Sequence, residues 1–405
     1  MYIWVWLPGA STPIVAGRID RIDGDIKFTY GDSYLANPLA VALYLPELPL
    51  RAGTINPPKG LRAPGCIVDA GPDGWGRRVI LRKIAGVGAD IDVGALDLVT
   101  YLLESGSDRT GALDFQTSAT EYVPRVNHAT LEELLEAAGR VEQGVPFSPA
   151  VDLALLHGSS LGGARPKTHI NDGPRRLIAK FARLSDTYSI VKAEGVAMNL
   201  ARRVGIDVAT VEVIECARRD VLLVERFDRT PVVGQRRMMV SALTVLGLDE
   251  GGGQLATYPG LADEIRQRFT EPKKSLRELF SRVAFNICVG NTDDHARNHS
   301  AFWDGSDLSL TPAYDICPQL RSGGEAVQAM AIGADRYKFS RLSGLVAAAP
   351  LYHLTPVEGQ EIIDHQIEVI RSQWDAAADA ARMTQVDRDL LWGRAILNPY
   401  CLEKE

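Results

Sequence analysis

An aspartate and an asparagine stand five positions apart in the polar run Asp293-Asp-His-Ala-Arg-Asn298. This is the spacing of a kinase catalytic loop, in which the aspartate positions the acceptor hydroxyl and the asparagine binds magnesium. A strand-like run then ends at a second carboxylate, Asp315. Because Mg²⁺ prefers oxygen ligands, the Asn298 amide and the Asp315 carboxylate are predicted to hold it. Polar loops of this composition are also common as structural turns, so the fragment needs support from elsewhere in the chain.

A lysine inside an apolar run supplies that support. Lys180 lies within residues 175–181, a run that reads as a β-strand. An unpaired ammonium buried there would cost several kcal/mol, so an anionic group should meet it. Glu194, on the helix expected next, is the predicted partner, and the two side chains together could hold an ATP phosphate. The alternative is a lysine at a strand edge whose ammonium reaches water.

A glycine-rich segment that contains Gly162, Gly163 and Lys167 precedes this strand. It is not a Walker A loop, because Gly163 stands four residues before Lys167 and Pro166 intervenes. Consecutive glycines can still present backbone amides to phosphate oxygens. A simple turn explains such a segment equally well, so it counts only together with Lys180 and the acidic residues.

Two histidines in the same polar run could be zinc ligands. His295 and His299 have the i, i+4 spacing of such ligands, but the glutamate of H-E-x-x-H is missing and no third ligand is evident. A zinc hydrolase is therefore not expected. We interpret His295 as a residue that orders the loop close to the ATP phosphate. The sequence has no G-x-S-x-G elbow, so nothing in it indicates nucleophilic hydrolysis.

Composition narrows the class of protein. A chain of 405 residues, 46% hydrophobic and 23% charged, is long enough for about two or three domains. Its net charge of -7 argues against bulk attraction to nucleic acid. The five cysteines are scattered and odd in number, which favours a reducing compartment over a disulfide framework. The N-terminal run lacks signal-peptide features and no apolar run reaches the length of a membrane span, so we expect a cytoplasmic protein without membrane contact.

The N-terminal third alternates short β-branched and aromatic runs with turns. Residues 2–30 predict a small antiparallel sheet, 54–76 a loop rich in proline and glycine, and 76–104 helical structure. Thr130 and Glu133 have capping-box spacing, which predicts a helix over 131–140.

The middle of the chain has the order of a small nucleotide-holding lobe. After the glycine segment come the strand at 175–181, a helix at about 190–204 and a strand pair ending at 220–229. From about 240 the chain becomes mainly helical, with capping boxes predicted at Ser275 and at Thr355.

Seven short motifs, in this order, resemble the HipA family of toxin kinases over nearly the whole length. They are Pro72-Asp-Gly-Trp-Gly-Arg77, Asp108-Arg-Thr-Gly-Ala-Leu113, Ser160-Leu-Gly-Gly-Ala-Arg-Pro-Lys167, Ile178-Ala-Lys180, Glu225-Arg-Phe-Asp-Arg229, Asn291-Thr-Asp-Asp-His-Ala-Arg-Asn298 and Pro312-Ala-Tyr-Asp315. The resemblance implies an α+β, two-lobed fold related to protein kinases and phosphoinositide-3-kinases, with a β-rich N-terminal subdomain (1–120), a nucleotide-binding lobe (121–235) and a helical C-terminal lobe (236–405).

The resemblance also implies roles for individual residues. Asp293 would be the catalytic base, Lys180 would contact the ATP phosphates, and Asn298 with Asp315 would hold magnesium. Together with His295, interpreted above, Asp293 and Lys180 form the predicted catalytic set. Glu225 and Phe227 would form the hinge that meets adenine. The full set of residues expected to contact ATP is Ser160, Gly162, Gly163, Lys167, Lys180, Glu194, Glu225, Phe227 and Asp228. Ser160 resembles an autophosphorylated serine, with Ser159 the less favoured neighbour. A phosphate on Ser160 would add negative charge where the glycine loop must contact an anionic triphosphate. The phosphorylated loop should therefore be expelled from the site.

Partners follow from the same resemblance. Members of the family typically act as the toxin of a toxin–antitoxin pair, held by a HipB-like helix-turn-helix antitoxin that also binds operator DNA. The implied target is a translation protein such as an aminoacyl-tRNA synthetase, usually the glutamyl enzyme, with growth arrest and persistence as the result. Arg297 departs from the family, in which lysine is frequent at this position. Arginine keeps the charge but has a different hydrogen-bond geometry, so the rate of turnover, more than activity itself, is in question. Two other hypotheses stay open: a catalytically idle, antitoxin-binding regulator of DNA, and a small-molecule phosphotransferase.

Overall fold

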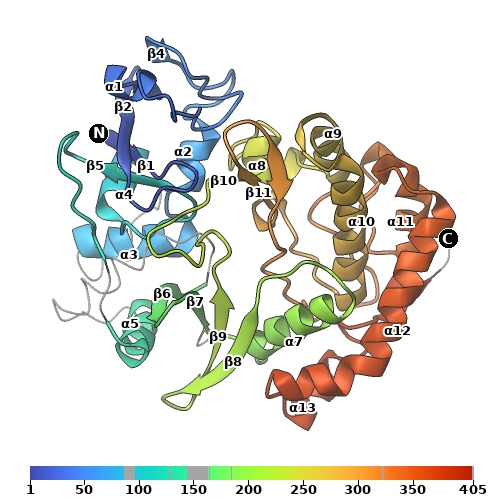
Figure 1. Ribbon diagram of the computed structural model, residues 1–405. Coiled ribbons are helices and arrows are strands. Elements are labelled where there is room, and N and C mark those ends of the chain that lie inside the picture. The colour runs from blue at the N-terminus through green and yellow to red at the C-terminus, as the bar shows by residue number, and fades with distance from the viewer. Residues whose placement is uncertain are drawn as a thin grey trace.

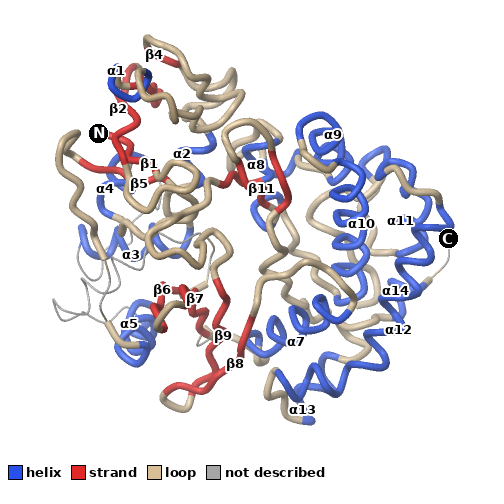
Figure 2. Tube along the Cα trace, in the orientation of Figure 1, coloured by secondary structure: helices blue, strands red, loops and turns tan. Residues whose placement is uncertain are grey.

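The computed structural model describes most of the chain, and it does so over residues 1–85, 96–126, 129–143, 163, 165–183, 185–321 and 323–403. These residues form a β-rich N-terminal subdomain, a small lobe around a second sheet, and a helical lobe that carries the C-terminus (Figure 1). Figure 2 shows that most of the helical structure lies in this last lobe, whereas most of the strands lie in the other two parts. The three parts follow in the expected order, and the exact domain boundaries stay predictions.

The N-terminal subdomain is built on a five-stranded antiparallel sheet in the order β4-β3-β2-β1-β5. Buried and less buried side chains alternate along β3, as expected for a sheet with one face on a core. The sheet predicted over residues 2–30 is therefore confirmed. The strands are β1 (Tyr2–Val5), β2 (Ile14–Ile22), β3 (Asp25–Tyr30), β4 (Thr54–Ile55) and β5 (Leu113–Gln116).

The helices of this subdomain correct one expectation. They are α1 (Asp32–Leu35), α2 (Gly65–Asp69), α3 (Gly74–Ala85) and α4 (Leu98–Glu104). Residues 54–76 were expected to be loop, but they contain β4 and α2. The carboxylate of Glu47 accepts hydrogen bonds from the first amides of α2, at Gly65 (2.8 Å) and Cys66 (2.9 Å). Because this cap comes from a distant part of the sequence, no local pattern shows it.

The small lobe holds a four-stranded antiparallel sheet in the order β6-β7-β9-β8, between two helices. One face packs against α5 through a cluster that includes Leu134 and Leu177, and the other packs against α7. The Thr130 capping box is present, since Thr130 and Glu133 exchange hydrogen bonds. The elements are α5 (Leu131–Gln143), β6 (Lys167–Asp172), β7 (Arg175–Phe181), α7 (Ile190–Arg203), β8 (Val211–Cys216) and β9 (Arg219–Glu225).

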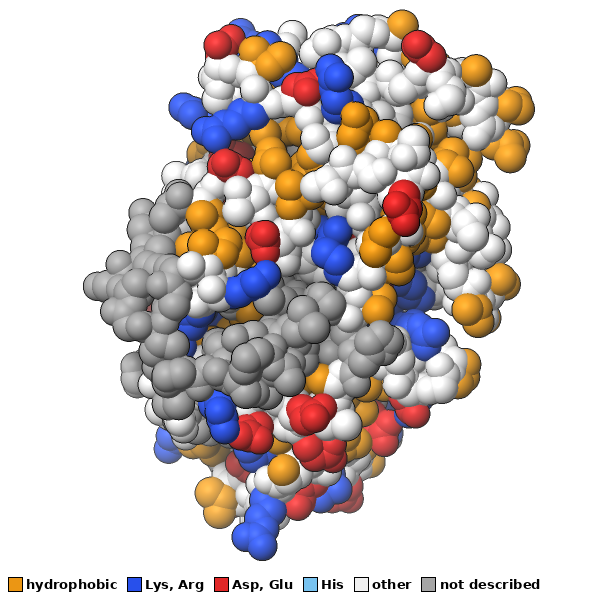
Figure 3. Space-filling model, turned by 90° about the vertical axis from the view of Figure 1, so that its left-hand side faces the viewer, with side chains coloured by type: hydrophobic (Ala, Val, Ile, Leu, Met, Phe, Trp, Pro, Cys, Tyr) orange, Lys and Arg blue, Asp and Glu red, His pale blue; other side chains and the backbone are white. Residues whose placement is uncertain are grey.

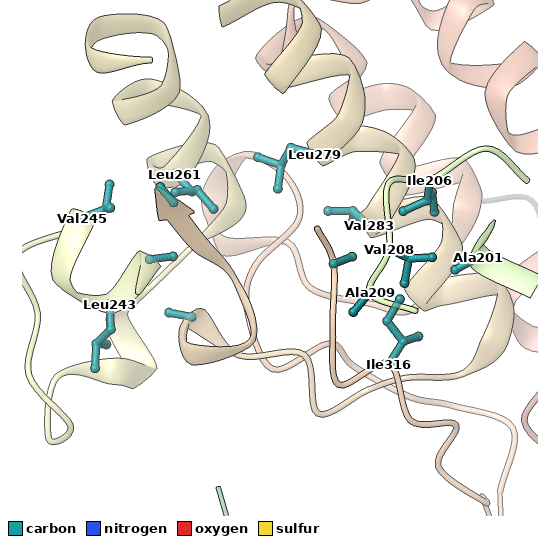
Figure 4. Packing of buried hydrophobic residues seen from close by; sticks show 14 of the residues in the cluster. Ala201, Ile206, Val208, Ala209, Leu243, Val245, Leu261, Leu279, Val283 and Ile316 are labelled. Carbon is teal, nitrogen blue, oxygen red and sulfur yellow. The ribbon is translucent and has the colours of Figure 1, made fainter. Parts of the chain in front are cut away.

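The helical lobe surrounds α10, most of whose side chains are buried. Leu279 and Val283 of α10 belong to the same buried cluster as Ile206 and Val208, which follow α7 and are labelled with them in Figure 4. The long helix α12 packs against α7, α10 and α11 and so ties the two lobes together. The helices are α8 (Ala242–Val245), α9 (Tyr258–Arg268), α10 (Pro272–Val289), α11 (Leu342–Ala348), α12 (Pro356–Ala380), α13 (Gln385–Leu391) and α14 (Pro399–Leu402), and the strands are β10 (Met239–Ser241), β11 (Ser300–Trp303) and β12 (Leu308–Leu310).

Two predicted helix starts have different outcomes. The capping box at Thr355 is present at the start of α12. The one predicted at Ser275 is wrong, because α10 begins one turn earlier at Pro272, and the Ser275 amide already donates to the carbonyl of Glu271. Proline is well suited to a first helical position, where its missing N–H is not needed. Glu278 instead pairs with Arg282 along the helix (2.8 Å).

Three further observations concern the described residues. No helix among the described residues is long and apolar enough to cross a membrane. All five cysteines are free thiols, of which only Cys317 is not fully buried. On the face shown in Figure 3, acidic and basic side chains are interspersed rather than gathered into one region of a single sign.

Replacing Leu279 by alanine tests the packing around α10. The side chain is fully buried, so its truncation is expected to lower the free energy of unfolding by about 2–5 kcal/mol through lost contacts and a residual cavity. Leu39→Ala is the matched control, because Leu39 is 72% exposed. Equal urea midpoints for the two variants would contradict the packing described here.

Candidate active site

The register of the small sheet brings Lys180 and Glu194 together. Lys180 lies opposite Leu222 in the antiparallel pairing of β7 with β9, so the two side chains share one face of the sheet. Leu222 packs in the cluster that includes Val196 of α7, whereas Leu177 packs toward α5. Lys180 therefore points toward α7, the helix that carries Glu194.

Lys180 forms two ion pairs. Its Nζ lies 2.5 Å from Oε1 of Glu194 and also contacts Oδ1 of Asp315, a residue of the helical lobe. Burial alone would lower the pKa of the Lys180 ammonium, but the carboxylates of Asp315 and Glu194 outweigh burial and raise it. Burial alone would raise the pKa of the Asp315 carboxyl, yet Lys180 and Lys167 hold it well below its usual range. Lys180 and Asp315 therefore both stay charged near neutral pH.

The position of Asp315 is fixed by the backbone before it and the core after it. Ala313 forms a parallel bridge with Val208, and its carbonyl accepts the Ala209 amide at 2.9 Å. Ile316 is buried and lies beside this segment in Figure 4. Asp315 itself has a φ of 60°, in the left-handed region that non-glycine residues rarely adopt. Such a conformation persists only where the surroundings determine it, which is consistent with a functional position.

The polar loop that carries Asp293 is anchored through its neighbour Asp294. The Oδ2 atom of Asp294 accepts hydrogen bonds from Tyr258, from Asn286 (2.7 Å) and from His299 (2.8 Å). All four side chains are buried. His299 is thereby engaged in the core while His295 is exposed, so the two histidines do not share a metal site.

Asp293, by contrast, is exposed, although the loop desolvates its carboxylate enough to raise the pKa. The positive charge of His295 opposes this shift, and the negative charge of Asp315 adds to it. Asn298 is buried and donates its Nδ2 to the carbonyl of Asp293 at 3.4 Å, which leaves its amide oxygen for another ligand. The candidate base is therefore close enough to Asp315 for the charge of that residue to affect its pKa, and Asn298 contacts the backbone of the candidate base.

Lys167 brings a second ammonium to the same place. It lies opposite Lys180 in the pairing of β6 with β7, so both side chains share one face. Burial and the charge of Lys180 lower the pKa of Lys167. Gly163 lies against it, since a Cβ at Gly163 would collide with the Lys167 ammonium, and its φ of 102° suits glycine. Two cations in close proximity favour an anionic ligand between them.

The expected hinge residues follow β9. The side chain of Glu225 is exposed, and its amide donates to the carbonyl of Thr210 at 2.8 Å. The ring of Phe227 packs against Tyr314, 5.7 Å between centroids, and Tyr314 directly precedes Asp315. The expected hinge therefore lies beside the residue that precedes the candidate metal ligand Asp315.

Asp228 is not brought together with the other candidates. Its carboxylate is buried and accepts from Arg226 (2.7 Å), Arg229 (3.0 Å) and the amide of Gly111 (2.8 Å). These contacts join the hinge to the N-terminal subdomain and occupy both carboxylate oxygens. No local pattern in the sequence indicated this arginine cluster. The predictions for Ser159, Ser160 and Gly162 concern residues outside the described part of the chain.

Sequence reasoning also missed how Arg297 is used. Its two terminal nitrogens contact different carboxylates, Asp73 at 3.2 Å and Glu250 at 2.8 Å. A planar guanidinium can bridge two acids in this way, whereas a lysine ammonium offers a single nitrogen. Arg297 therefore ties the catalytic loop to the N-terminal subdomain, a contact between residues far apart in sequence.

Truncating the two adjacent aspartates separates their roles. Asp294→Ala leaves the buried Tyr258, Asn286 and His299 donors without their acceptor, at a cost of about 1–3 kcal/mol for each unsatisfied group. We expect a clear fall in melting temperature. Asp293→Ala, the control, removes an exposed side chain and should leave the melting temperature close to wild type. A fall of the same size in both variants would contradict these assignments.

Comparison with known proteins gives matches over both halves of the chain. Residues 5–116 match the HipA N-terminal domain, and residues 159–374, more than half of the chain, match the HipA-like C-terminal domain. The chain is 26% identical over 183 residues to the serine/threonine-protein kinase toxin HipA of Shewanella oneidensis, an alignment covering 39% of this chain and 42% of that protein. It is 26% identical over 350 residues, 77% of this chain and 76% of the relative, to Y4mE of Sinorhizobium fredii, which carries a provisional kinase name.

A third relative and one solved structure complete the comparison. Toxin YjjJ of Escherichia coli is 26% identical over 184 residues, 42% of this chain and 40% of that protein. The chain thus spans about two fifths of two of these relatives. The HipA chain in a complex of Shewanella oneidensis HipA, HipB and operator DNA superimposes with a TM-score of 0.69 at 18% identity, covering 96% of this chain and 95% of that one. This likeness confirms the expected α+β fold, and the two matched domains show that the chain belongs to the HipA family.

Proposed function

We propose that this protein is an ATP- and magnesium-dependent serine/threonine kinase that acts as the toxin of a toxin–antitoxin pair. The observation that carries the proposal is the Lys180 ammonium, which bridges Glu194 of the small lobe and Asp315 of the helical lobe. A strand lysine, a helix glutamate and a metal-binding aspartate in this relation are the phosphate-holding set of protein kinases.

The donors present fit a magnesium ion. The Asn298 amide oxygen and the Asp315 carboxylate are hard oxygen ligands, and both belong to rigidly held backbone. Magnesium prefers such ligands together with phosphate oxygens, whereas a soft metal would call for thiolates. When bound, the ion would neutralise charge that develops on the transferred phosphoryl group.

The chain's own side chains would bind and orient the reactants. Lys167 and Lys180 would pair with phosphate oxygens, which relieves the repulsion between their ammonium groups. Asp293 would accept a hydrogen bond from the acceptor hydroxyl and take its proton, a role that its exposure and raised pKa favour. Backbone groups near Glu225 and the ring of Phe227 would meet adenine, as the family resemblance implies. We also propose that His295 orders the loop beside Asp293.

Autophosphorylation at Ser160 is part of the proposal. Two described residues of the glycine segment support it, since Lys167 lies opposite Lys180 and Gly163 lies against Lys167. A phosphoserine in that segment would introduce nearly two negative charges, which would compete for the same lysines and repel the triphosphate. The modification would therefore silence the enzyme.

The proposed biological role follows from the family. The Shewanella oneidensis structure contains HipA with HipB and operator DNA. By analogy, we propose that this chain is inhibited by a HipB-like antitoxin and meets operator DNA mainly through it. We further propose a cytoplasmic location and a translation protein as substrate, with an aminoacyl-tRNA synthetase, glutamyl first, as the candidate to examine.

Asp293→Asn tests the phosphotransfer. The substitution keeps size and hydrogen bonding but removes the base, so transfer of labelled phosphate from ATP should fall by about 10²–10⁴-fold. Magnesium-dependent ATP binding should persist, because Lys180, Asn298 and Asp315 are unchanged. Mass spectrometry after incubation with ATP and magnesium should find phosphate on wild type, at Ser160, and none on the variant.

The same pair of proteins examines the toxin role in cells. Wild type should arrest growth on expression, and Asp293→Asn should not. Wild type that incorporates no phosphate would overturn the kinase proposal, and an active kinase that leaves growth unchanged would overturn only the toxin role.

The dependence of kcat/KM on pH offers a second test. Because Asp293 must be ionised to act as base, activity should fall as pH falls through its pKa, which burial raises above the ordinary value of about 3.9. His295 lowers this pKa through its positive charge, so His295→Asn should move the acid limb to higher pH. A limb that stays in place or moves to lower pH would contradict the electrostatic coupling.

A further inference from the structure

A carboxylate of the N-terminal subdomain reaches the phosphate end of the candidate site. Asp73 directly precedes α3, and its side chain is only 18% exposed. One oxygen, Oδ1, accepts a hydrogen bond from the Gly163 amide, and the other, Oδ2, accepts from Nη1 of Arg297 at 3.2 Å. A single side chain thus joins the glycine segment to the catalytic loop.

The contact with the glycine segment is made twice. While the Asp73 carboxylate holds the Gly163 amide, the amide of Trp75 donates to the Gly163 carbonyl at 2.9 Å. Both backbone groups of Gly163 are therefore engaged by one turn of the N-terminal subdomain. Because Gly163 lies against the Lys167 ammonium, this turn also fixes the wall next to that lysine.

The contact with the catalytic loop is likewise supported from a second side. Glu250 accepts Nη2 of Arg297 at 2.8 Å and both terminal nitrogens of Arg77, at 3.1 and 3.2 Å. Arg77 belongs to α3, one turn after Asp73, and its Nε donates to the carbonyl of Pro72 at 3.0 Å. The start of α3 therefore grips Arg297 through Asp73 and through Arg77 with Glu250.

We infer that Asp73 is a positioning residue of the phosphotransfer site, through which the N-terminal subdomain aligns the glycine segment with the catalytic loop. The inference rests on the proposed kinase function. Arg297 stands between Asp293 and Asn298 in the chain, so movement of its guanidinium shifts the loop that carries the base and a metal ligand. Asp73 acts indirectly: it affects ATP binding through Gly163 and the position of the acceptor hydroxyl through Arg297.

The two arms predict different kinetic signatures. Asp73→Ala releases both, so the KM for ATP should rise and kcat should fall, each by about 10-fold or more, since small misplacements are costly in catalysis. Arg297→Gln releases only the catalytic loop, so kcat should fall by a similar factor while the KM for ATP stays within about 2-fold of wild type. Asp73→Glu, which keeps the charge, should recover part of the loss.

A double variant tests the coupling itself. Because Asp73 and Arg297 act partly through each other, Asp73→Ala with Arg297→Gln should lower kcat by clearly less than the product of the two single losses. Asp20→Asn is the matched control, since it breaks an exposed ion pair with Arg18 in the same subdomain and should leave both constants unchanged. Melting temperatures should be measured for every variant, so that loss of fold is separated from loss of alignment.

The outcomes are distinguishable from those of the kinase proposal. Absence of phosphotransfer by wild type would overturn the proposed function. In that case calorimetry with ATP and magnesium would still test the contact through Gly163, because Asp73→Ala should bind ATP more weakly than wild type. Active wild type with wild-type constants in folded Asp73→Ala would overturn this inference alone. Losses in the double variant that multiply would also overturn it, because they would show independent effects.

Discussion

One buried ammonium links the parts of this molecule. Lys180 lies on a strand of the small lobe, and its charge is compensated by Glu194 from the adjacent helix and by Asp315 from the helical lobe. Removing one partner of such a buried group leaves an uncompensated charge, which is strongly destabilising. The two lobes must therefore stay in register at this point. The same constraint brings cations and carboxylates together at one site, where, under the proposed function, a metal–triphosphate would replace the internal ion pairs.

Much of the surrounding architecture serves to hold that register. The helix α12 packs on both α7 and α10, the bridge between Val208 and Ala313 fixes the approach to Asp315, and Asp294 anchors the catalytic loop through three buried donors. The N-terminal subdomain adds a second set of contacts, in which its Gly111 amide donates to Asp228 and its Asp73 carboxylate accepts from the Gly163 amide. If the proposed phosphotransfer takes place at this site, the subdomain helps to position its residues.

The sequence predicted those features that depend on local spacing. Periodic apolar runs defined the strand with Lys180 and the helix with Glu194, and desolvation of an ammonium was enough to pair them. It failed where distant residues decide. Ser275 has the pattern of a cap but lies inside a helix that starts at Pro272. Asp228 was expected at the nucleotide, yet arginines and Gly111 occupy it, and nothing near Asp73 indicated a contact with Arg297.

The central claim is that Lys180, Asp293, Asn298 and Asp315 serve a single metal–triphosphate. A crystal structure with magnesium and a non-hydrolysable ATP analogue tests it most directly. The account predicts a magnesium ion about 2.0–2.1 Å from the Asn298 amide oxygen and an Asp315 carboxylate oxygen, with the Lys180 ammonium on a phosphate and Asp293 facing the terminal phosphate. A nucleotide bound elsewhere, or a metal held by neither Asn298 nor Asp315, would contradict it.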